Sequence, residues 1–488
     1  MTPLRQRKTR IIATLGPASD NFDNIEKLFL AGADLFRINF SHGKQEEKAE
    51  LIKTIRAIEE KHKRPIGIMA DLQGPKFRIS TFKDGEIDLK EGDHFSFDLI
   101  DEPGTQSRVY LPHPEIFSAL KEGSHVLLND GKLKLRVLER SDNSAKCLVL
   151  NNGILSDRKG VNLPDALIPL AALTEKDISD VQFAIKHGVD WVALSFVQRP
   201  DDIKECRKYV GNKAGIIAKI EKPAALDTIE EITSRADALM VARGDLGVEM
   251  PLEDVPVIQR RLIRIARTQG KPVVVATQML ESMITAPVPT RAEVSDVATA
   301  VYTGADGVML SAESAVGDYP SEAVSVMDRI AKQVESDPNA QSTNIDLGLA
   351  PNATPEDAIT AAARHTAKTV KAGAIVTYTS SGSTALRTSR ERPSTPILAL
   401  TPSTKTARRL TLAWGLNTVR TKDVHSFEEM VAKARRMVLR NKIAKAGDRI
   451  VITAGVPFGT PGATNVLHIT WLYGNELDDE KGVKFKAE

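Results

Sequence analysis

The sequence predicts an α/β protein with three parts: a parallel βα barrel, a small β domain inserted into it, and a C-terminal α/β domain. Three observations support this fold class. Short β-branched apolar runs alternate with longer segments of helical period, which is typical of βα units around a parallel sheet. The gap between residues 71 and 191 is too long for one such unit. The pattern of apolar and polar residues changes again after about Pro351.

The apolar runs have the length and composition of buried parallel strands. Between the second and third runs, Leu51, Ile52, Ile55 and Ile58 fall on one face of a helix that Pro65 ends. Eight such units favour a closed (β/α)8 TIM barrel, and an open doubly wound sheet is the alternative. The runs are Thr9–Thr14, Leu35–Asn39, Ile66–Asp71, Trp191–Phe196, Ile216–Ile220, Ala238–Val241, Val273–Ala276 and Val308–Leu310.

The long gap predicts a small antiparallel β domain of barrel form. Its segments Glu86–Lys90 and Lys132–Val137 alternate polar and apolar residues, and Asn129-Asp130-Gly131 is typical of a hairpin turn. An insertion after a barrel strand lies over the catalytic end of the barrel. We therefore expect a lid hinged at Gly74-Pro75 and Leu163-Pro164, and a passive decoration is the alternative.

These patterns divide the chain into three domains. We assign residues 1–72 and 172–350 to the catalytic barrel and residues 73–171 to the lid. Residues 351–488 form the C-terminal domain, for regulation and oligomerisation. Its strands are expected at Ala374–Tyr378, Pro396–Leu400, Arg449–Thr453 and Val466–Thr470.

Composition narrows the class of protein. The 66 basic and 64 acidic side chains leave a formal charge of +2, which offers no strong field for nucleic acid or an anionic membrane. No apolar run reaches the length of a membrane span. Cys147 and Cys206 are the only cysteines, which excludes a disulfide framework and a Cys-rich metal site. A reducing, cytoplasmic location is expected.

Charged and hydroxyl side chains gather where six of the predicted strands end, which in a barrel is the catalytic face. Arginine and lysine there suit an anionic, phosphorylated substrate. Carboxylates with open positions suit Mg²⁺ or Mn²⁺, as phosphoryl transfer requires. The cations are Arg37, Arg78 and Lys219, the carboxylates Asp71, Glu221 and Asp245, and the hydroxyls Thr277 and Ser311.

Each of these residues has a simpler interpretation when taken alone. A charged residue at a strand end commonly caps a helix or joins a surface ion pair. Arg243-Gly244-Asp245 is also typical of a turn with an N-cap aspartate. The convergence of six strand ends on one phosphate-and-metal site favours the catalytic interpretation.

Six long motifs follow one another along nearly the whole chain: IIATLGP (11–17), RINFSHG (37–43), KIEK (219–222), MVARGDLG (240–247), ATQMLESM (276–283) and PTRAE (289–293). Together they resemble the pyruvate kinase family. The resemblance implies transfer of a phosphoryl group from phosphoenolpyruvate to ADP, which gives pyruvate and ATP in the final step of glycolysis. It also implies a homotetramer.

The resemblance carries roles to the matching positions. Arg37 and Lys219 would bind the transferring phosphoryl group, and Lys219 would stabilise the transition state. Glu221 and Asp245 would hold the divalent metal.

The same resemblance assigns the rest of the site. The backbone of Gly244 and Asp245, with the Thr277 hydroxyl, would receive the substrate carboxylate. Thr277 and Ser311 are candidates for the path that protonates the enolpyruvate intermediate, and substrate positioning is their alternative role. The residues near the nucleotide would be Asn39, His42, Arg78 and Lys159, the last of which lid closure would deliver.

One segment departs from the commoner family pattern. Many members read Asp-Thr-Lys-Gly-Pro-Glu here and need K⁺, whereas this chain reads Asp71-Leu72-Gln73-Gly74-Pro75-Lys76. Leu72 lacks the hydroxyl that would help to hold a monovalent cation, and Lys76 brings a fixed ammonium. We expect that K⁺ is not required. The vestigial monovalent site would comprise Asn39, Ser41, Asp71 and Leu72.

A second anion site is expected in the C-terminal domain. The run Thr379, Ser380, Ser381, Gly382, Ser383 and Thr384 lies between a predicted strand and helix, where hydroxyls and a helix start form a phosphate nest. The resemblance implies a sugar-phosphate or nucleotide effector there, together with the loop at 458–462. An unoccupied helix start is the alternative.

Two other functions compete with the kinase. A magnesium-dependent aldolase or lyase of 2-oxo acids would also use Glu221 and Asp245, but it does not explain Arg37, Arg78 and Lys219 together. An inactive barrel that senses a metabolite would not need this intact set.

Overall fold

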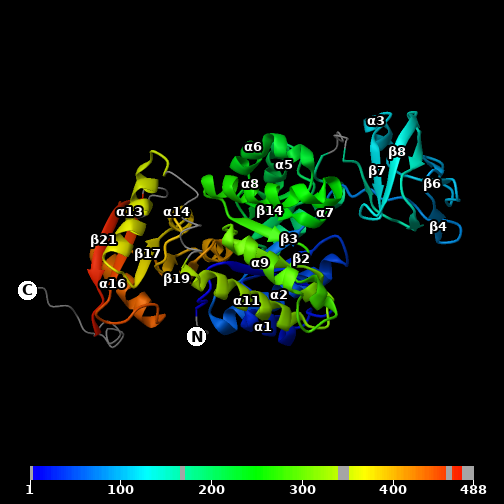
Figure 1. Cartoon of the computed structure of the whole chain (residues 1–488). Coiled ribbons are helices and arrows are strands. Elements are labelled where there is room, and N and C mark those ends of the chain that lie inside the picture. The colour runs from blue at the N-terminus through cyan, green and yellow to red at the C-terminus, as the bar shows by residue number, and fades with distance from the viewer. Residues whose placement is uncertain (1–3, 165–170, 339–350, 458–463, 475–488) are drawn as a thin grey trace, which may run out of the picture.

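A closed barrel of eight parallel strands lies in the middle of the molecule, with the inserted β domain on one side and the C-terminal α/β domain on the other (Figure 1). This computed structural model describes residues 4–164, 171–338, 351–457 and 464–474. The arrangement confirms the predicted fold class. The open-sheet alternative is wrong, because the eighth strand pairs with the first.

The order of the barrel strands around the ring is their order along the chain. Their side chains are almost wholly buried, because helices cover the outer face and the barrel interior is packed. The strands are β1 (Arg10–Leu15), β2 (Leu35–Asn39), β3 (Gly67–Asp71), β12 (Trp191–Leu194), β13 (Gly215–Ile220), β14 (Ala238–Ala242), β15 (Val273–Ala276) and β16 (Gly307–Leu310).

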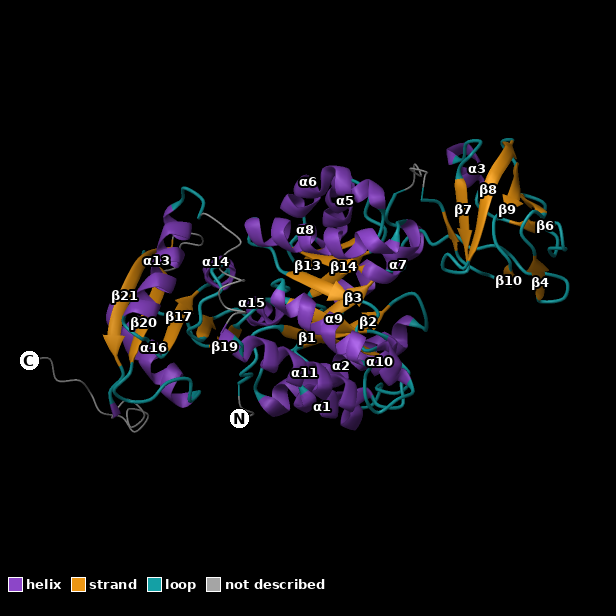
Figure 2. Ribbon diagram, in the orientation of Figure 1, coloured by secondary structure: helices purple, strands orange, loops and turns teal. Residues whose placement is uncertain are grey.

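Amphipathic helices surround these strands (Figure 2). In α2 the buried residues Ile52, Ile55 and Ile58 recur at helical spacing, as the sequence predicted. Among the described helices, none is both long and apolar enough to cross a membrane. The barrel helices are α1 (Phe22–Ala31), α2 (Gln45–His62), α4 (Glu175–Lys186), α5 (Pro200–Val210), α6 (Ile229–Arg235), α7 (Arg243–Glu249), α8 (Val255–Thr268), α9 (Arg291–Tyr302), α10 (Ala312–Ala315) and α11 (Pro320–Ser336).

The inserted lid has its own apolar core, which includes Phe95, Phe97 and Phe117. Its hairpin turn lies at Asn129, Asp130 and Gly131, all with positive φ, as predicted. The lid contains a parallel pair, β5 with β6, so it is mixed rather than wholly antiparallel. Its elements are β4 (Glu86–Leu89), β5 (His94–Asp98), β6 (Arg108–Tyr110), α3 (Pro114–Ala119), β7 (His125–Leu128), β8 (Leu133–Arg140), β9 (Ser144–Val149), β10 (Gly153–Ser156) and β11 (Val161–Asn162).

The C-terminal domain is a five-stranded sheet in the order β19-β18-β17-β20-β21, in which only β21 runs antiparallel. The edge strand β19 was not anticipated, because its sequence Leu-Asn-Thr-Val-Arg alternates with polar residues and forms no apolar run. The elements of the C-terminal domain are α13 (Pro355–Thr369), β17 (Ala374–Tyr378), α14 (Ser383–Arg390), β18 (Ile397–Thr401), α15 (Thr404–Arg409), β19 (Leu416–Arg420), α16 (Phe427–Arg440), β20 (Arg449–Gly455) and β21 (Thr464–Trp471).

The connection from the barrel to the inserted domain requires a glycine. Gly74 has a φ of +67°, and a Cβ built there would lie 2.7 Å from the ring of Phe196 and 3.0 Å from Cβ of Ser195. Gly85, inside the lid, has a φ of +80° but no neighbour within 4 Å of such a Cβ. The two glycines therefore differ in crowding and not in backbone conformation.

We expect Gly74→Ala to destabilise the chain more than Gly85→Ala. Left-handed strain alone costs about 1 kcal/mol, and overpacking against the Phe196 ring adds about 1–3 kcal/mol. Thermal unfolding of the two variants measures the difference. Equal losses of stability would show that the contact with Phe196 relaxes freely.

Candidate active site

A cluster of opposite charges lies at the carboxyl end of the barrel, where strands β2, β3 and β13 end. The register pairs Asn39 with Asp71, so the ends of β2 and β3 are level. Side chains of Arg37, Asp71 and Lys219 alternate with buried apolar neighbours along their strands, which points them into the barrel mouth.

Lys219 is the centre of this cluster. Its Nζ lies 2.9 Å from Oε1 of Glu221 and 3.1 Å from Oδ1 of Asp71, and it donates a hydrogen bond of 2.6 Å to Oγ of Ser195. Arg37 holds the other oxygen of Asp71, with its Nε at 2.6 Å, and donates to Oγ1 of Thr14 at 3.2 Å. Two cations and two acids thus meet in one network.

The network sets the charge of each member. Burial would lower the pKa of Lys219, but the carboxylates of Asp71 and Glu221 raise it above its ordinary value. Burial would raise the pKa of Asp71, but Lys219 and Arg37 bring it below its usual range. Lys219 therefore stays charged and Asp71 stays ionised at neutral pH.

Glu221 is the member whose charged form is disfavoured by its surroundings. Burial raises its pKa, Lys219 partly offsets this, and the negative charge of Asp245 adds to the rise. Its Oε2 accepts a hydrogen bond of 2.8 Å from the amide of Phe196. Its buried Oε1 forms the ion pair with Lys219 and has no aligned hydrogen bond to any residue that the structure describes.

These features fit a divalent cation. Glu221 and Asp245 are close enough for their charges to repel, and a cation between them would relieve that repulsion. Within the described residues, no group of three His, Cys, Asp or Glu side chains could hold a metal. The two carboxylates would thus share the ion with substrate oxygens and water, as Mg²⁺ prefers.

The loop after β15 is hydrogen-bonded to the start of helix α7. The amide of Gly244 donates a hydrogen bond of 2.7 Å to Oγ1 of Thr277, which itself donates to the carbonyl of Ala276 at 2.5 Å. Thr277 has a φ of +71°, a strained conformation for a β-branched residue. Arg243 holds this loop, because it donates to the carbonyl of Thr277 at 2.6 Å and pairs with Asp296.

The remaining residues named from the sequence fall in three places. Asn39, Ser41 and His42 lie at the end of β2, where Oδ1 of Asn39 accepts from the amide of Ser41 at 3.0 Å. The amide of Ser311, which precedes α10, donates to Glu313 at 2.7 Å. Leu72 is buried in the barrel core.

The third place is the stem of the lid, by which we mean the paired segments 76–79 and 158–160. Arg78 pairs with Gly160 in a short antiparallel bridge, and the guanidinium of Arg78 donates to the carbonyl of Arg158 at 2.9 Å. Lys159 lies in the same stem, where its carbonyl accepts from the amide of Ile79. A Cβ built on Gly160 would lie 3.8 Å from Cε of Lys76, so the Lys76 side chain lies against Gly160.

Two residues of the network were missed from the sequence. Thr14 is the penultimate residue of β1, and Ser195 directly follows β12. Both are uncharged, so a search for phosphate and metal ligands passes over them. Reading every strand end of the predicted barrel would have found them.

The hydroxyl-rich run of the C-terminal domain lies at the start of α14. Oγ1 of Thr379 accepts from the amide of Gly382 at 2.8 Å, and Oγ1 of Thr384 lies 2.6 Å from that of Thr464, so these two hydroxyls serve the fold. Ser381 and Ser383 instead line a cavity of about 300 Å³ between this domain and the barrel. The expected second half of the site, at 458–462, lies outside the described residues.

Comparison with models of protein families shows to which family the chain belongs. A model described as "Pyruvate kinase, barrel domain" matches residues 6–324, and one described as "Pyruvate kinase, alpha/beta domain" matches residues 357–470. The chain belongs to the pyruvate kinase family. This confirms the predicted kinship and the enzyme class, a phosphotransferase, over the lyase and sensor alternatives.

Individual relatives agree with the family models. The chain is 53% identical to a pyruvate kinase of Methylorubrum extorquens, over 96% of this chain and 98% of that one. It is 50% identical to one of Agrobacterium vitis, over 96% and 97%. The crystal structure of a pyruvate kinase from Cryptosporidium parvum superposes with a TM-score of 0.90 at 34% identity, covering 96% of this chain and 98% of that chain.

Proposed function

We propose that this chain transfers the phosphoryl group of phosphoenolpyruvate to ADP at the Lys219 cluster. The observation that carries this is the position of Lys219, whose ammonium is held between two buried carboxylates beside Arg37. A fixed pair of cations at one point suits a transferring phosphoryl group, whose charge must be neutralised as it moves. Glycolysis is the pathway in which this reaction has its place.

In this reaction an oxygen of the ADP β-phosphate attacks phosphorus, and the bond from phosphorus to the enol oxygen breaks. Arg37 and Lys219 bind the phosphoryl oxygens throughout. Mg²⁺ or Mn²⁺, held by Glu221 and Asp245, supplies further charge neutralisation when bound. The amides of Gly244 and Asp245, with Thr277, receive the carboxylate of the substrate.

The enolpyruvate that leaves must then take a proton at carbon to become pyruvate. Thr277 and Ser311 are proposed to act there through water. The Thr277 hydroxyl already donates to the carbonyl of Ala276 and accepts from Gly244, which supports a positioning role over direct proton donation.

Lys219→Met should lower the rate of ATP formation from phosphoenolpyruvate and ADP by at least about 1000-fold, because it removes the fixed charge beside the phosphorus. Lys213→Met is the matched control, since Lys213 is exposed before β13. A coupled assay measures both. Retained activity in Lys219→Met would assign the phosphoryl group to another part of the chain.

We propose that the lid contributes to the nucleotide site. Arg78 and Lys159 lie in its stem, and closure of the lid would bring them toward Asn39 and His42 on the barrel. Lys76 lies in the same stem, beside Gly160. Its ammonium would then take the place of K⁺ near Asn39, Ser41 and Asp71 when the lid closes.

Activity should accordingly change little when K⁺ replaces a bulky organic cation at constant ionic strength. Lys76→Glu should lose activity that K⁺ partly restores, because the carboxylate recreates a cation ligand. Lys83→Glu, elsewhere in the lid, controls for the change of charge. A strong activation of the unaltered enzyme by K⁺ would contradict the proposal.

We propose that an anionic effector, a sugar phosphate or a nucleotide, binds at Ser381 and Ser383. Their cavity is also lined by Lys271, Arg387 and Arg409, which supply positive charge from both domains. A hexose phosphate or AMP should shift the saturation curve for phosphoenolpyruvate, and Ser383→Asp should abolish the shift by repulsion. An unchanged curve with both anions would leave this helix start without an effector.

We propose a homotetramer, which exposed apolar side chains on both the C-terminal domain and the barrel support. Strand β21 is an edge of its sheet and exposes Ile469 and Trp471, while the barrel exposes Leu252, Val257 and Val288. Two different two-fold contacts build a tetramer, and the molar mass in solution tests this. A cytoplasmic location is also proposed, since Cys147 and Cys206 are both buried and free.

A further inference from the structure

Four aspartates recur at equivalent places on the amino-terminal side of the barrel, opposite the active site. Each is the residue directly before an even-numbered strand of the barrel, β2, β12, β14 or β16. The local sequences are Gly-Ala-Asp, Gly-Val-Asp, Arg-Ala-Asp and Gly-Ala-Asp. We call these residues the aspartate ring: Asp34, Asp190, Asp237 and Asp306.

Every member of the ring clamps the preceding odd-numbered strand at a single residue. The carboxylate oxygen accepts from the amide of that residue at 2.8–3.1 Å, and the aspartate amide donates back to its carbonyl at 2.8–3.0 Å. The clamped residues are Ile11 on β1, Ile68 on β3, Ile216 on β13 and Val273 on β15.

The clamped strands carry much of the active-site network. Three residues beyond the clamps on β1, β3 and β13 lie Thr14, Asp71 and Lys219. Thr277 lies four residues beyond the clamp on β15. Because a strand rises about 3.3 Å per residue, each clamp holds its strand about 10–13 Å below the side chain that the strand presents to the site.

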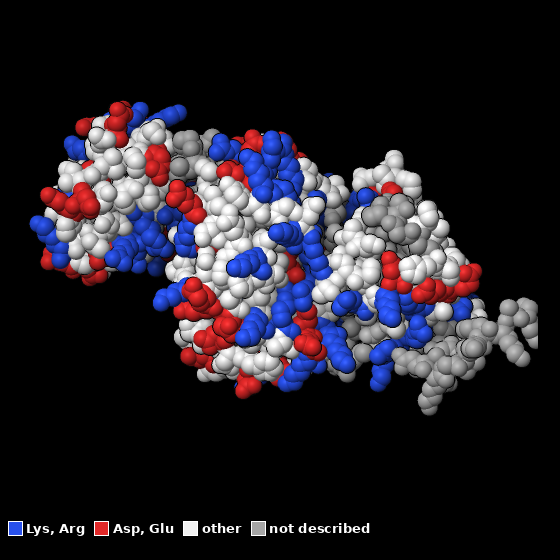
Figure 3. All heavy atoms as spheres, turned by 180° about the vertical axis from the view of Figure 1, so that it is seen from behind, with Lys and Arg blue, Asp and Glu red and all other residues white. Residues whose placement is uncertain are grey.

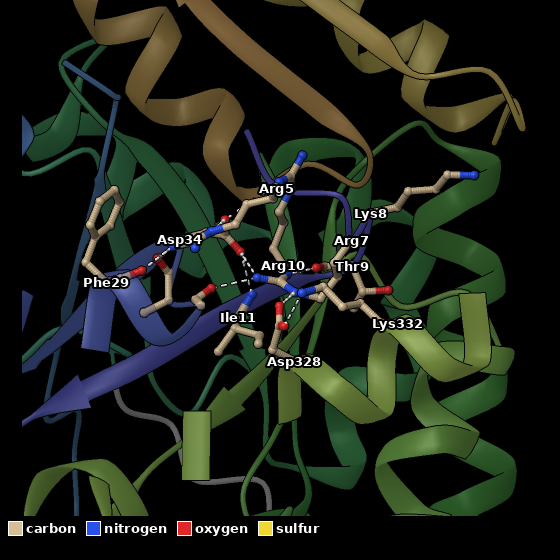
Figure 4. A network of polar contacts seen from close by, with 12 residues as sticks. Arg5, Arg7, Lys8, Thr9, Arg10, Ile11, Phe29, Asp34, Asp328 and Lys332 are labelled. Carbon is tan, nitrogen blue, oxygen red and sulfur yellow. Dashed lines mark hydrogen bonds and ion pairs between the residues drawn. The ribbon is translucent and has the colours of Figure 1, made fainter. Parts of the chain in front are cut away.

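Each carboxylate of the ring is also held by arginine. Asp34 pairs with Arg7 at 2.9 Å (Figure 4) and Asp190 pairs with Arg56 at 2.6 Å. The guanidinium groups of Arg7, Arg10 and Arg5 outweigh the effect of burial and lower the pKa of Asp34 to about 2. At Asp190 burial has the larger effect and raises the pKa, although Arg56 offsets part of that rise. Three of the four carboxylates are buried and Asp237 is half-buried, and each of the four has an arginine partner.

The C-terminal domain reaches the ring through its own arginines. Arg392 donates to Asp306 at 3.0 Å, and Arg409 lies 3.7 Å from Asp237. Arg408 holds both carboxylate oxygens of Glu59, at 2.9 and 3.0 Å from its Nε, and Glu59 holds Arg56, the partner of Asp190. Viewed from behind, Lys and Arg side chains gather where the barrel meets this domain (Figure 3).

We propose that the aspartate ring positions the active site through the odd-numbered strands, and that the arginines of the C-terminal domain set the geometry of the ring. Losing one of these arginines then loosens the clamp at the base of a strand that presents a residue such as Asp71 or Lys219, without any contact between the C-terminal domain and substrate. The kinetic part of this proposal rests on the proposed function, since it is read out as turnover of phosphoenolpyruvate.

Asp237 offers the cleanest test, because it is the most exposed member of the ring and is held from both domains, by Arg207 at 2.7 Å and by Arg409. Asp237→Asn keeps an oxygen that can accept from Ile216 but loses the charge. Arg409→Gln removes the link to the C-terminal domain. Lys368→Gln is the matched control, since Lys368 is exposed on helix α13 of the same domain.

We expect Asp237→Asn and Arg409→Gln each to raise the phosphoenolpyruvate concentration at half-saturation by about 3-fold or more, in the absence of effectors, while kcat changes by less than about 2-fold. Arg409→Lys should restore most of the loss. Lys368→Gln should leave the saturation curve unchanged. A purely structural role would lower the melting temperature and leave the half-saturation of the folded enzyme unaltered, which would overturn the proposal.

Hydrogen exchange gives a readout that is independent of turnover. Amides of residues 214–222 should exchange faster in Asp237→Asn and Arg409→Gln than in Lys368→Gln, because the clamp on Ile216 is loosened. Faster exchange together with an unchanged saturation curve would show a clamp that does not position the site. Unchanged exchange in both variants would refute the clamp itself. If the unaltered chain lacked turnover, the proposed function would fail while the exchange result still stood.

Discussion

The burial of one ammonium between two carboxylates is the constraint on which the active site depends. Lys219 lies within about 3 Å of both Asp71 and Glu221, and no one of the three could remain charged at this depth without the others. The arrangement is costly as a source of stability, because desolvation of such groups consumes most of their attraction. Its benefit is a charge of fixed position, which a phosphoryl group in transit requires.

The barrel explains how this constraint can be met. A strand buried on both faces has little freedom to slide, so the sheet fixes the positions of the side chains at its end. The loops that follow the strands are different. Thr277 adopts a left-handed conformation, which hydrogen bonds from Gly244 and Arg243 help to hold. Rigid strands supply the cations and acids, and a strained turn supplies the polar surface opposite them.

Much of this was accessible from the sequence, and the limits have physical causes. Buried parallel strands form continuous apolar runs, so the bounds of β2 and β15 were predicted to the residue. The half-exposed edge strand β19 has no such run and was missed. Within the site the charged residues were predicted, but Thr14 and Ser195 were not, since their role depends on which side chain faces them across the barrel. The fourfold Asp pattern is present in the sequence, but only the clamped amides give it meaning.

Strand β3 pairs directly with β12, although the whole lid separates them in the chain. The lid also packs around a core of its own and not around that of the barrel. The lid is therefore a separate structural module, inserted between two neighbouring strands of the barrel. A short turn in its place would leave the closed ring of strands and the Lys219 cluster intact. With the roles proposed above for Arg78 and Lys159, such a barrel would keep its site for phosphoenolpyruvate and lose part of its site for ADP.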